Sequence, residues 1–193
     1  MNKYIFFGFF LICCILIKNP IYAKENNFEI FSECADEYEF SCNVIKEVNK
    51  VNNVLLKDVK SPVIKRINND IFMVKISCGS PCQVNFFYGR NKQDSTNEFI
   101  AINESSNCLI ESDSIEKKIY AREVFSTRKI MIADLNAKEY SMMHQRFDYY
   151  NYFKRKSKFL ENGDLMLVAN DASNLIIEKK IIKPCGGNNE LFR

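Results

Sequence analysis

The chain has 193 residues, a formal net charge of +3 and a hydrophobic fraction of 47%. Two of its positive charges, Lys3 and Lys18, fall in the first 23 residues, so the rest of the chain is close to neutral. A nearly neutral chain gives no support to a nucleic-acid partner. Residues 24–193 suffice for one domain with a substantial core, and we find no repeat or linker that would divide them.

The N-terminus has the order of parts of a secretory signal peptide. Lys3 precedes an apolar run over residues 4–17, Asn19-Pro20 then breaks any helix, and Ala23 supplies a small residue for cleavage. The run is shorter than the roughly 20 residues needed to span a bilayer, so a membrane anchor fits it less well. We therefore expect cleavage near Ala23 and a mature protein that is periplasmic or secreted, without a stable membrane anchor.

The first part of the mature chain predicts short strands. Residues 28–31 form the first of them. Residues 38–56 fit both an alternating pattern and a helical stripe of valines, which leaves helix or strand open over 40–56. The β-branched content favours two strands joined by a turn at Asn52-Asn53.

The clearest alternation follows from residue 71. Residues 71–76 and 84–88 predict a hairpin, and Gly, Ser and Pro between Cys78 and Cys82 predict its tight turn. The polar residues 89–97 predict a surface loop. Short apolar runs at close spacing then predict four more strands, at residues 98–103, 108–111, 119–125 and 129–133.

The C-terminal part mixes two patterns. Aromatic and methionine residues three or four apart predict helix or irregular structure over 137–147, followed by an aromatic strand, although helix or strand stays open over 137–150. A turn at 161–164 predicts a hairpin into a strand over 165–169. The last strand covers 175–182, and residues 186–193 form a frayed tail. Together these elements predict a mainly β protein: a single antiparallel meander, sandwich or barrel-like domain with little helix, stapled by disulfides.

Six cysteines follow the predicted signal peptide, an even number that is typical of paired thiols in an exported protein. Sequence alone does not settle how six cysteines pair. Local spacing favours Cys34–Cys42 around a short polar stretch and Cys78–Cys82 across the hairpin turn, which leaves Cys108–Cys185 by elimination.

A second interpretation makes Cys78 and Cys82 a metal or redox site. Two cysteines separated by three residues, with the distant His144, resemble the copper site of Sco-type assembly proteins, because thiolates and imidazole suit copper. The chain lacks the βαβ pattern of that family, and Gln83 stands where the family has proline. A structural disulfide is therefore the favoured interpretation, with no cofactor expected.

The best candidate for a partner surface combines aromatic and basic residues near the C-terminus. Such a mixture can bind polyanions, carbohydrate or an acidic protein, although an aromatic core strand followed by a basic turn has the same pattern. Its members are Tyr149, Tyr150, Tyr152, Lys154, Arg155, Lys156 and Lys158.

Catalytic motifs are weak throughout. His144 is the single imidazole of the chain, and no nucleophile motif accompanies it. The carboxylate pairs Glu37/Glu39 and Asp113/Glu116 could in principle serve a hydrolase, but both fall in polar turns. We assign no catalytic residue.

The stretch from Val74 to Cys82, with an aromatic strand after it, resembles a group of uncharacterised exported bacterial proteins that carry a Cys-Gly-Ser/Thr-Pro-Cys turn in a β-rich domain. This resemblance covers residues 71–125. It implies a periplasmic, disulfide-bonded β domain and no particular activity.

Export, disulfides and the lack of a catalytic constellation lead to three functional hypotheses. The first is a non-enzymatic periplasmic or secreted binding or inhibitor protein of the immunity type, with a protein partner. The second is a copper-binding or thiol-redox protein that uses Cys78 and Cys82. The third is a hydrolase that uses the turn carboxylates.

Overall fold

The computed structural model describes residues 28–79, 82–143, 149–171 and 174–186. The predicted signal peptide, His144 and the predicted tail beyond Gly186 lie outside these residues. The described chain is mainly β and contains four open antiparallel sheets. Each sheet is a meander of consecutive strands, in the spatial orders β1-β2-β3, β4-β5-β6-β7, β11-β10-β9-β8 and β12-β13-β14. The predicted fold class is therefore confirmed.

The bounds of the strands follow most of the predicted runs. In chain order they are β1 (Phe28–Cys34), β2 (Cys42–Val48), β3 (Val51–Val59), β4 (Val63–Asn68), β5 (Ile71–Ser77), β6 (Gln83–Tyr88), β7 (Gln93–Thr96), β8 (Phe99–Asn103), β9 (Cys108–Asp113), β10 (Lys118–Glu123), β11 (Ile130–Asp134), β12 (Lys158–Phe159), β13 (Leu165–Asp171) and β14 (Asn174–Ile181).

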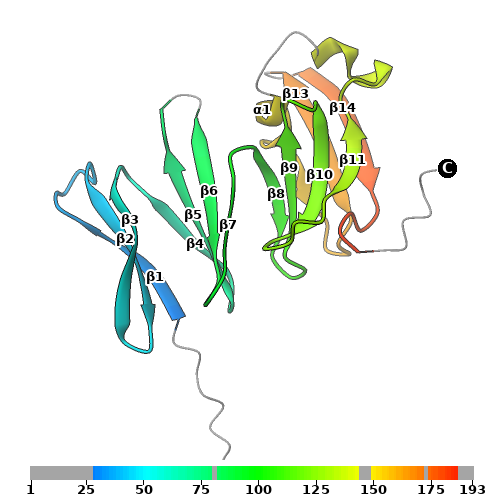
Figure 1. Ribbon diagram of the computed structural model, residues 1–193. Coiled ribbons are helices and arrows are strands. Elements are labelled where there is room, and N and C mark those ends of the chain that lie inside the picture. The colour runs from blue at the N-terminus through cyan, green and yellow to red at the C-terminus, as the bar shows by residue number, and fades with distance from the viewer. Residues whose placement is uncertain (1–27, 80–81, 144–148, 172–173, 187–193) are drawn as a thin grey trace, which may run out of the picture.

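The first two sheets form an N-terminal lobe, β1 to β7, and the last two form a C-terminal lobe, β8 to β14 (Figure 1). Side chains alternate between the two faces of a strand. On β5, Phe72 and Val74 therefore face one way and pack with Phe28 and Val44 of the first sheet. This contact is the core of the N-terminal lobe.

The opposite face of β5 and β6 is also buried. Ile71 and Phe87 pack there against Leu109 of β9, across the junction between the lobes. Ile110, the residue after Leu109, points to the other side of β9 and packs with Leu165 in the core of the C-terminal lobe. Both middle sheets are thus covered on two faces, which is why five consecutive residues of β9 are buried.

Two strands, β2 and β3, do occupy most of the region 38–56, but residues 38–41 lie in a loop before β2, and the predicted position of the turn between the strands is wrong. The chain reverses at Asn49 and Lys50, which both have positive φ values of 52° and 65°. Two consecutive left-handed residues make the type of turn whose twist matches a two-residue hairpin. Asn52 and Asn53 lie inside β3 instead.

The predicted surface loop over 89–97 is also wrong, because it contains the strand β7 that pairs with β6. This strand is polar, yet Thr96 is buried and Asp94 half-buried. Asp94 is satisfied by Arg122 of β10, across the lobe junction. Burial of a paired polar side chain leaves no apolar alternation for a sequence pattern to detect.

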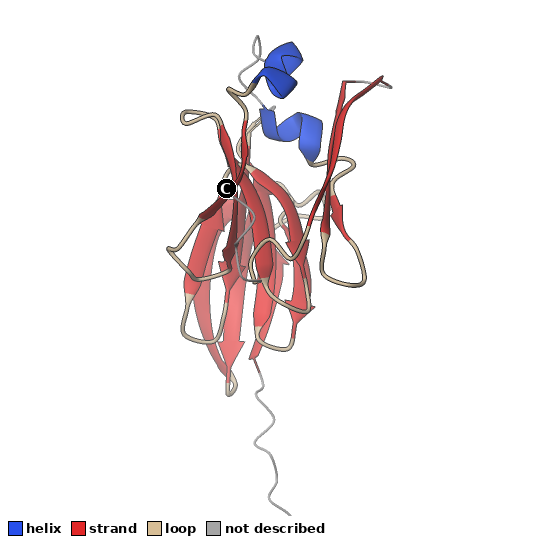
Figure 2. Cartoon of the chain, turned by 90° about the vertical axis from the view of Figure 1, so that its right-hand side faces the viewer, coloured by secondary structure: helices blue, strands red, loops and turns tan. Residues whose placement is uncertain are grey.

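The predicted aromatic strand after residue 147 is a short helix, α1 (Tyr149–Phe153), preceded in the chain by the 3₁₀ helix η1 (Lys138–Met143). Tyr152 and Phe153 are both buried in the C-terminal core. The helix lies against β8, β9 and β13. Figure 2 shows the helices gathered at one end of the sheets, so they cover that end of the fold.

The three disulfides have the pairing that local spacing favours: Cys34–Cys42, Cys78–Cys82 and Cys108–Cys185. The first joins the last residue of β1 to the first residue of β2, and these two cysteines are register partners. The second crosses the tip of the β5–β6 hairpin. The third ties β9 to the segment after β14, which links the start of the C-terminal lobe to its end.

Candidate functional site

The most distinctive surface feature is the loop that the Cys34–Cys42 disulfide closes, which we call the aromatic loop (residues 34–42). Asp36 organises it from within. One carboxylate oxygen of Asp36 accepts the backbone N–H groups of Tyr38 at 2.9 Å and Phe40 at 3.1 Å, and the other accepts that of Ser41 at 3.3 Å. An aspartate that caps its own turn in this way holds the backbone in one conformation.

The aromatic loop presents two large rings to solvent. The side chain of Tyr38 is 68% exposed and that of Phe40 is 58% exposed. Their ring centroids lie 6.0 Å apart, so the rings form one patch. The ammonium of Lys60 lies 4.4 Å from the centroid of the Phe40 ring. Clustered aromatics rimmed by polar groups are typical of contact surfaces.

The end of β3 and the residues that follow it support the aromatic loop from the side. The N–H of Ser61 donates to the carbonyl of Glu39 at 2.8 Å. The hydroxyl of Ser41 donates to Asp58 at 3.0 Å. With the disulfide and Asp36, these bonds fix the loop before any partner arrives, and a preorganised loop loses less conformational entropy on binding.

Sequence reasoning missed this site. It treated residues 35–39 as a polar stretch and assigned Tyr38 and Phe40 to the predicted strand. The available signal was the disulfide bracket itself, because a nine-residue ring cannot bury two aromatic side chains in a core of its own.

The structure separates the members of the predicted basic-aromatic surface. Tyr152 is 7% exposed and belongs to the C-terminal core, so a partner cannot reach it. Lys154 is half-buried, and its ammonium lies 3.5 Å from the side-chain oxygen of Gln83. Tyr149 and Tyr150 begin α1, and their side chains lie outside the described part of the chain. The exposed members are basic: Arg155, Lys156 and Lys158.

The copper hypothesis needs two free thiolates, whereas Cys78 and Cys82 are joined in a disulfide. Both cysteines are exposed at the tip of the hairpin. The third ligand of the hypothetical copper site, His144, lies outside the described residues. Within the described residues, no group of three or more His, Cys, Asp or Glu side chains could hold a metal ion.

Three of the predicted carboxylates, Glu37, Glu39 and Glu116, lie in turns or loops, and Asp113 is the last residue of β9. One oxygen of Asp113 accepts the N–H groups of Ile115 and Glu116, which caps the turn after β9. Glu116 accepts the hydroxyl of Tyr120, and this hydrogen bond raises the pKa of Tyr120 to about 12. Glu37 and Glu39 flank Tyr38 on the exposed aromatic loop.

A cleft of about 500 Å³ opens where β7 meets β9 and β10. At its wall the buried Arg122 donates to Glu111 at 3.0 Å and to Asp94 at 3.2 Å. Lys129 adds a second cation, 2.9 Å from Glu111. Two carboxylates therefore face two cations, and this network stabilises the junction between the lobes.

Burial alone would raise the pKa values of Asp94 and Glu111. Hydrogen bonds from Arg122 to both carboxylates outweigh burial, with further help from the Phe125 N–H at Asp94 and from Lys129 at Glu111. The pKa of each carboxyl therefore stays below its usual range. Both are ionised near neutral pH and are occupied by partners within the chain.

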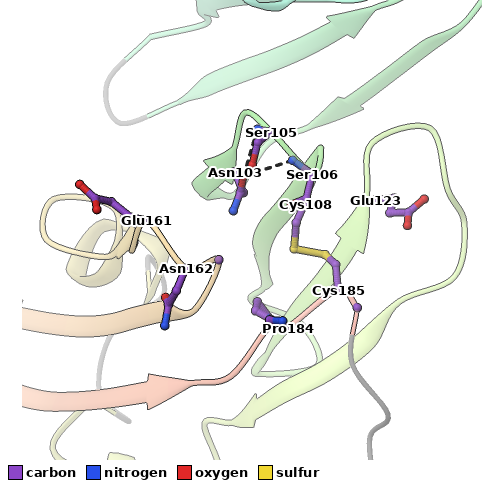
Figure 3. Close-up of a pocket in the computed structure, with 12 residues that line it drawn as sticks. Asn103, Ser105, Ser106, Cys108, Glu123, Glu161, Asn162, Pro184 and Cys185 are labelled. Carbon is purple, nitrogen blue, oxygen red and sulfur yellow. Dashed lines mark hydrogen bonds between the residues drawn. A yellow bond between two sulfur atoms is a disulfide. The ribbon is translucent and has the colours of Figure 1, made fainter.

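A second pocket, of about 290 Å³, lies beside the Cys108–Cys185 disulfide. Figure 3 shows Glu123 and Glu161 on opposite sides of the pocket. Asn103 accepts hydrogen bonds from the hydroxyl of Ser105 at 2.7 Å and from the N–H of Ser106 at 3.2 Å. The carboxylates do not converge, so this pocket offers no acid–base pair.

A scan of known protein-family models, a search of curated proteins and a search of solved structures found no match for this chain. Among the described residues, none of the helices has the length and apolar character needed to cross a bilayer.

Proposed function

We propose that this chain is an exported, non-enzymatic binding protein of the inhibitor or immunity type, which contacts a protein partner through its aromatic loop. The exposed pair Tyr38 and Phe40 on a disulfide-closed loop is the observation that carries this proposal. Aromatic side chains contribute a large share of the energy of protein interfaces, and they do so best when held rigidly.

Export is supported by two features of different kinds. The N-terminal segment has the order of parts of a signal peptide. The six cysteines that follow it are all paired, as in proteins of oxidising compartments such as the periplasm or the extracellular space. A rigid disulfide framework suits a protein that acts by presenting a surface.

The test is co-purification of partners from the native compartment without a reducing agent, so that the disulfides stay intact. The Y38A/F40A double variant is compared with the wild type and with I115A, since Ile115 is 94% exposed in a different turn. We expect wild type and I115A to recover the same partner, and the double variant to lose it at least tenfold. Equal thermal unfolding temperatures would establish that all three proteins are folded. Equal recovery by all three, or recovery of no partner by the wild type, would contradict the proposal.

A second candidate function is thiol–disulfide exchange at Cys78–Cys82, which the exposure of both cysteines favours. Exposed disulfides are more readily attacked by an external thiolate than buried ones. Stepwise reduction with mass-spectrometric thiol counting tests it. We expect this disulfide to open first; simultaneous opening of all three would count against an exchange role.

A further inference from the structure

The charges of the aromatic loop, and of Glu33 just before it, are of one sign. Between residues 33 and 42 every ionisable side chain other than cysteine and tyrosine is acidic: Glu33, Asp36, Glu37 and Glu39. Asp36 is engaged by three backbone N–H groups. The other three carboxylates are exposed, and within the described residues none of them takes part in an ion pair. The negative charge is therefore available to a partner.

The two rings of the loop differ in what covers them. The face of Phe40 is occupied by the ammonium of Lys60. Tyr38 contacts Phe40 at a tilt of 34°, and no cation of the described residues lies over its ring. Aromatic faces attract cations, and nearby carboxylates strengthen that attraction. The contact of Lys60 with the Phe40 ring is an example of the cation–π contact that the Tyr38 ring can make with another molecule.

We propose that the partner of the aromatic loop is a protein with a basic surface, whose Arg or Lys side chains pack on Tyr38 between Glu37 and Glu39. This inference rests on the proposed function and adds the chemistry of the partner. The chain as a whole carries a slight positive charge, so the acidic character belongs to this loop and not to the entire surface. Local charge complementarity of this kind steers association and excludes acidic competitors.

The test uses a phage-displayed library of random dodecapeptides as the probe and the mature, oxidised protein as the bait. We expect enrichment of peptides that combine Arg or Lys with an aromatic or aliphatic residue. Enrichment should fall at least tenfold on the E37Q/E39Q double variant and on Y38A. It should persist on E178Q, because Glu178 is an exposed carboxylate on β14, distant in sequence from the loop. Neither Glu37 nor Glu39 donates or accepts a side-chain hydrogen bond among those described, so the double variant should fold normally.

Salt supplies a second readout. The affinity of the selected basic peptides should fall at least tenfold when ionic strength rises several-fold, because exposed charges are screened. Enrichment of neutral or acidic peptides, equal enrichment on the double variant, or no enrichment that depends on the loop would overturn the inference.

A second copy of the chain is the competing occupant, since its exposed basic residues Arg155, Lys156 and Lys158 could face the acidic loop. Light scattering after size exclusion tests this directly, and a dimer that E37Q/E39Q abolishes would overturn the inference. The proposed function and the inference about the partner's charge can fail independently of each other. If Y38A/F40A loses the co-purified partner while the library yields no basic peptides, binding through the loop stands and only the basic character of the partner falls.

Discussion

Replacing Arg122 with methionine removes the central cation of the lobe junction while keeping much of its aliphatic length. The side chains of Arg122 and Glu111 are each 5% exposed, and that of Asp94 is 18% exposed. Removing one partner of a buried ion pair leaves an uncompensated charge in a poorly solvated place. We therefore expect R122M to be folded but clearly less stable than the wild type.

The magnitude follows from what each carboxylate retains. Breaking a buried pair typically costs about 3–5 kcal/mol of unfolding free energy. Glu111 keeps Lys129 at 2.9 Å, and Asp94 keeps the Phe125 N–H at 2.8 Å. These remaining partners place the expected loss at the lower end, about 3 kcal/mol. K65M is the matched control, because the Lys65–Glu104 pair also bridges the lobes but is about half exposed, and we expect it to cost about 0–1 kcal/mol.

The cost of R122M should depend on pH with a definite sign. In the wild type the pKa values of Asp94 and Glu111 lie below their usual range. Their contribution to stability is therefore present above the unfolded pKa of about 4, and it is lost as pH falls through the folded pKa. In R122M the main cause that lowers these pKa values is gone while burial remains. The difference between the two proteins should thus shrink on acidification.

Urea unfolding followed by far-ultraviolet circular dichroism measures this difference near neutral pH and near pH 3, with the disulfides intact. The chain contains no tryptophan, so circular dichroism is preferable to fluorescence. A loss below about 1 kcal/mol at neutral pH, equal to that of K65M, would refute the role of Arg122 at the junction. A loss that does not change with pH would refute the electrostatic explanation.

Three further predictions concern other parts of the fold. Replacing Cys108 and Cys185 together with alanine should lower the unfolding free energy by about 4–5 kcal/mol, against about 2 kcal/mol for the Cys78/Cys82 pair. The reason is that the cysteines of the first disulfide are 77 residues apart in the chain and those of the second only 4. Urea unfolding compares the two variants, and equal losses would contradict the loop-entropy explanation. Y88F should leave stability unchanged or raise it by up to about 1 kcal/mol, since the buried Tyr88 hydroxyl has no hydrogen-bond partner among the described residues. A net loss of stability at neutral pH would show that the hydroxyl is bonded. Burial raises the pKa of Tyr88 to about 12, so the unfolding free energy of the wild type should also fall as pH rises from about 10 to about 12, and that of the variant should fall less. G89A should cost about 1–3 kcal/mol, because a Cβ at Gly89 would meet the Phe125 ring at 3.2 Å at the lobe junction, and an unchanged thermal unfolding temperature would show that the ring gives way freely.

The parts of the fold that sequence reasoning predicted best are those that local chemistry decides. The β5–β6 hairpin needs only alternating side chains and a Gly-Ser-Pro turn between two cysteines, and all of these are adjacent in the chain. The same holds for the two short-range disulfides, whose partners are four and eight residues apart. The third pairing followed because few cysteines were left.

The candidate site could not be predicted, because exposure depends on what lies opposite a side chain. Tyr152 and Tyr38 are the same residue type, each in a tract with other aromatics and charges. Tyr152 is buried in the C-terminal core, in a helix that lies against β13, whereas Tyr38 stands on a disulfide-closed loop and is 68% exposed. The sequence pattern is similar in both places, and the tertiary environment differs.

Sequence by itself therefore determined the β class, the six paired cysteines and the rhythm of the strands, since each depends on residues close together in the chain. Tertiary structure alone decided the stacking of sheets on both faces of β5 and β9, the burial of the polar strand β7 through Arg122, and the exposure of Tyr38 and Phe40. The physical reason is the same in each case. Alternation states that a strand has two faces, but whether a face is covered by a sheet, paired with a charge or left in water depends on segments far away in the chain.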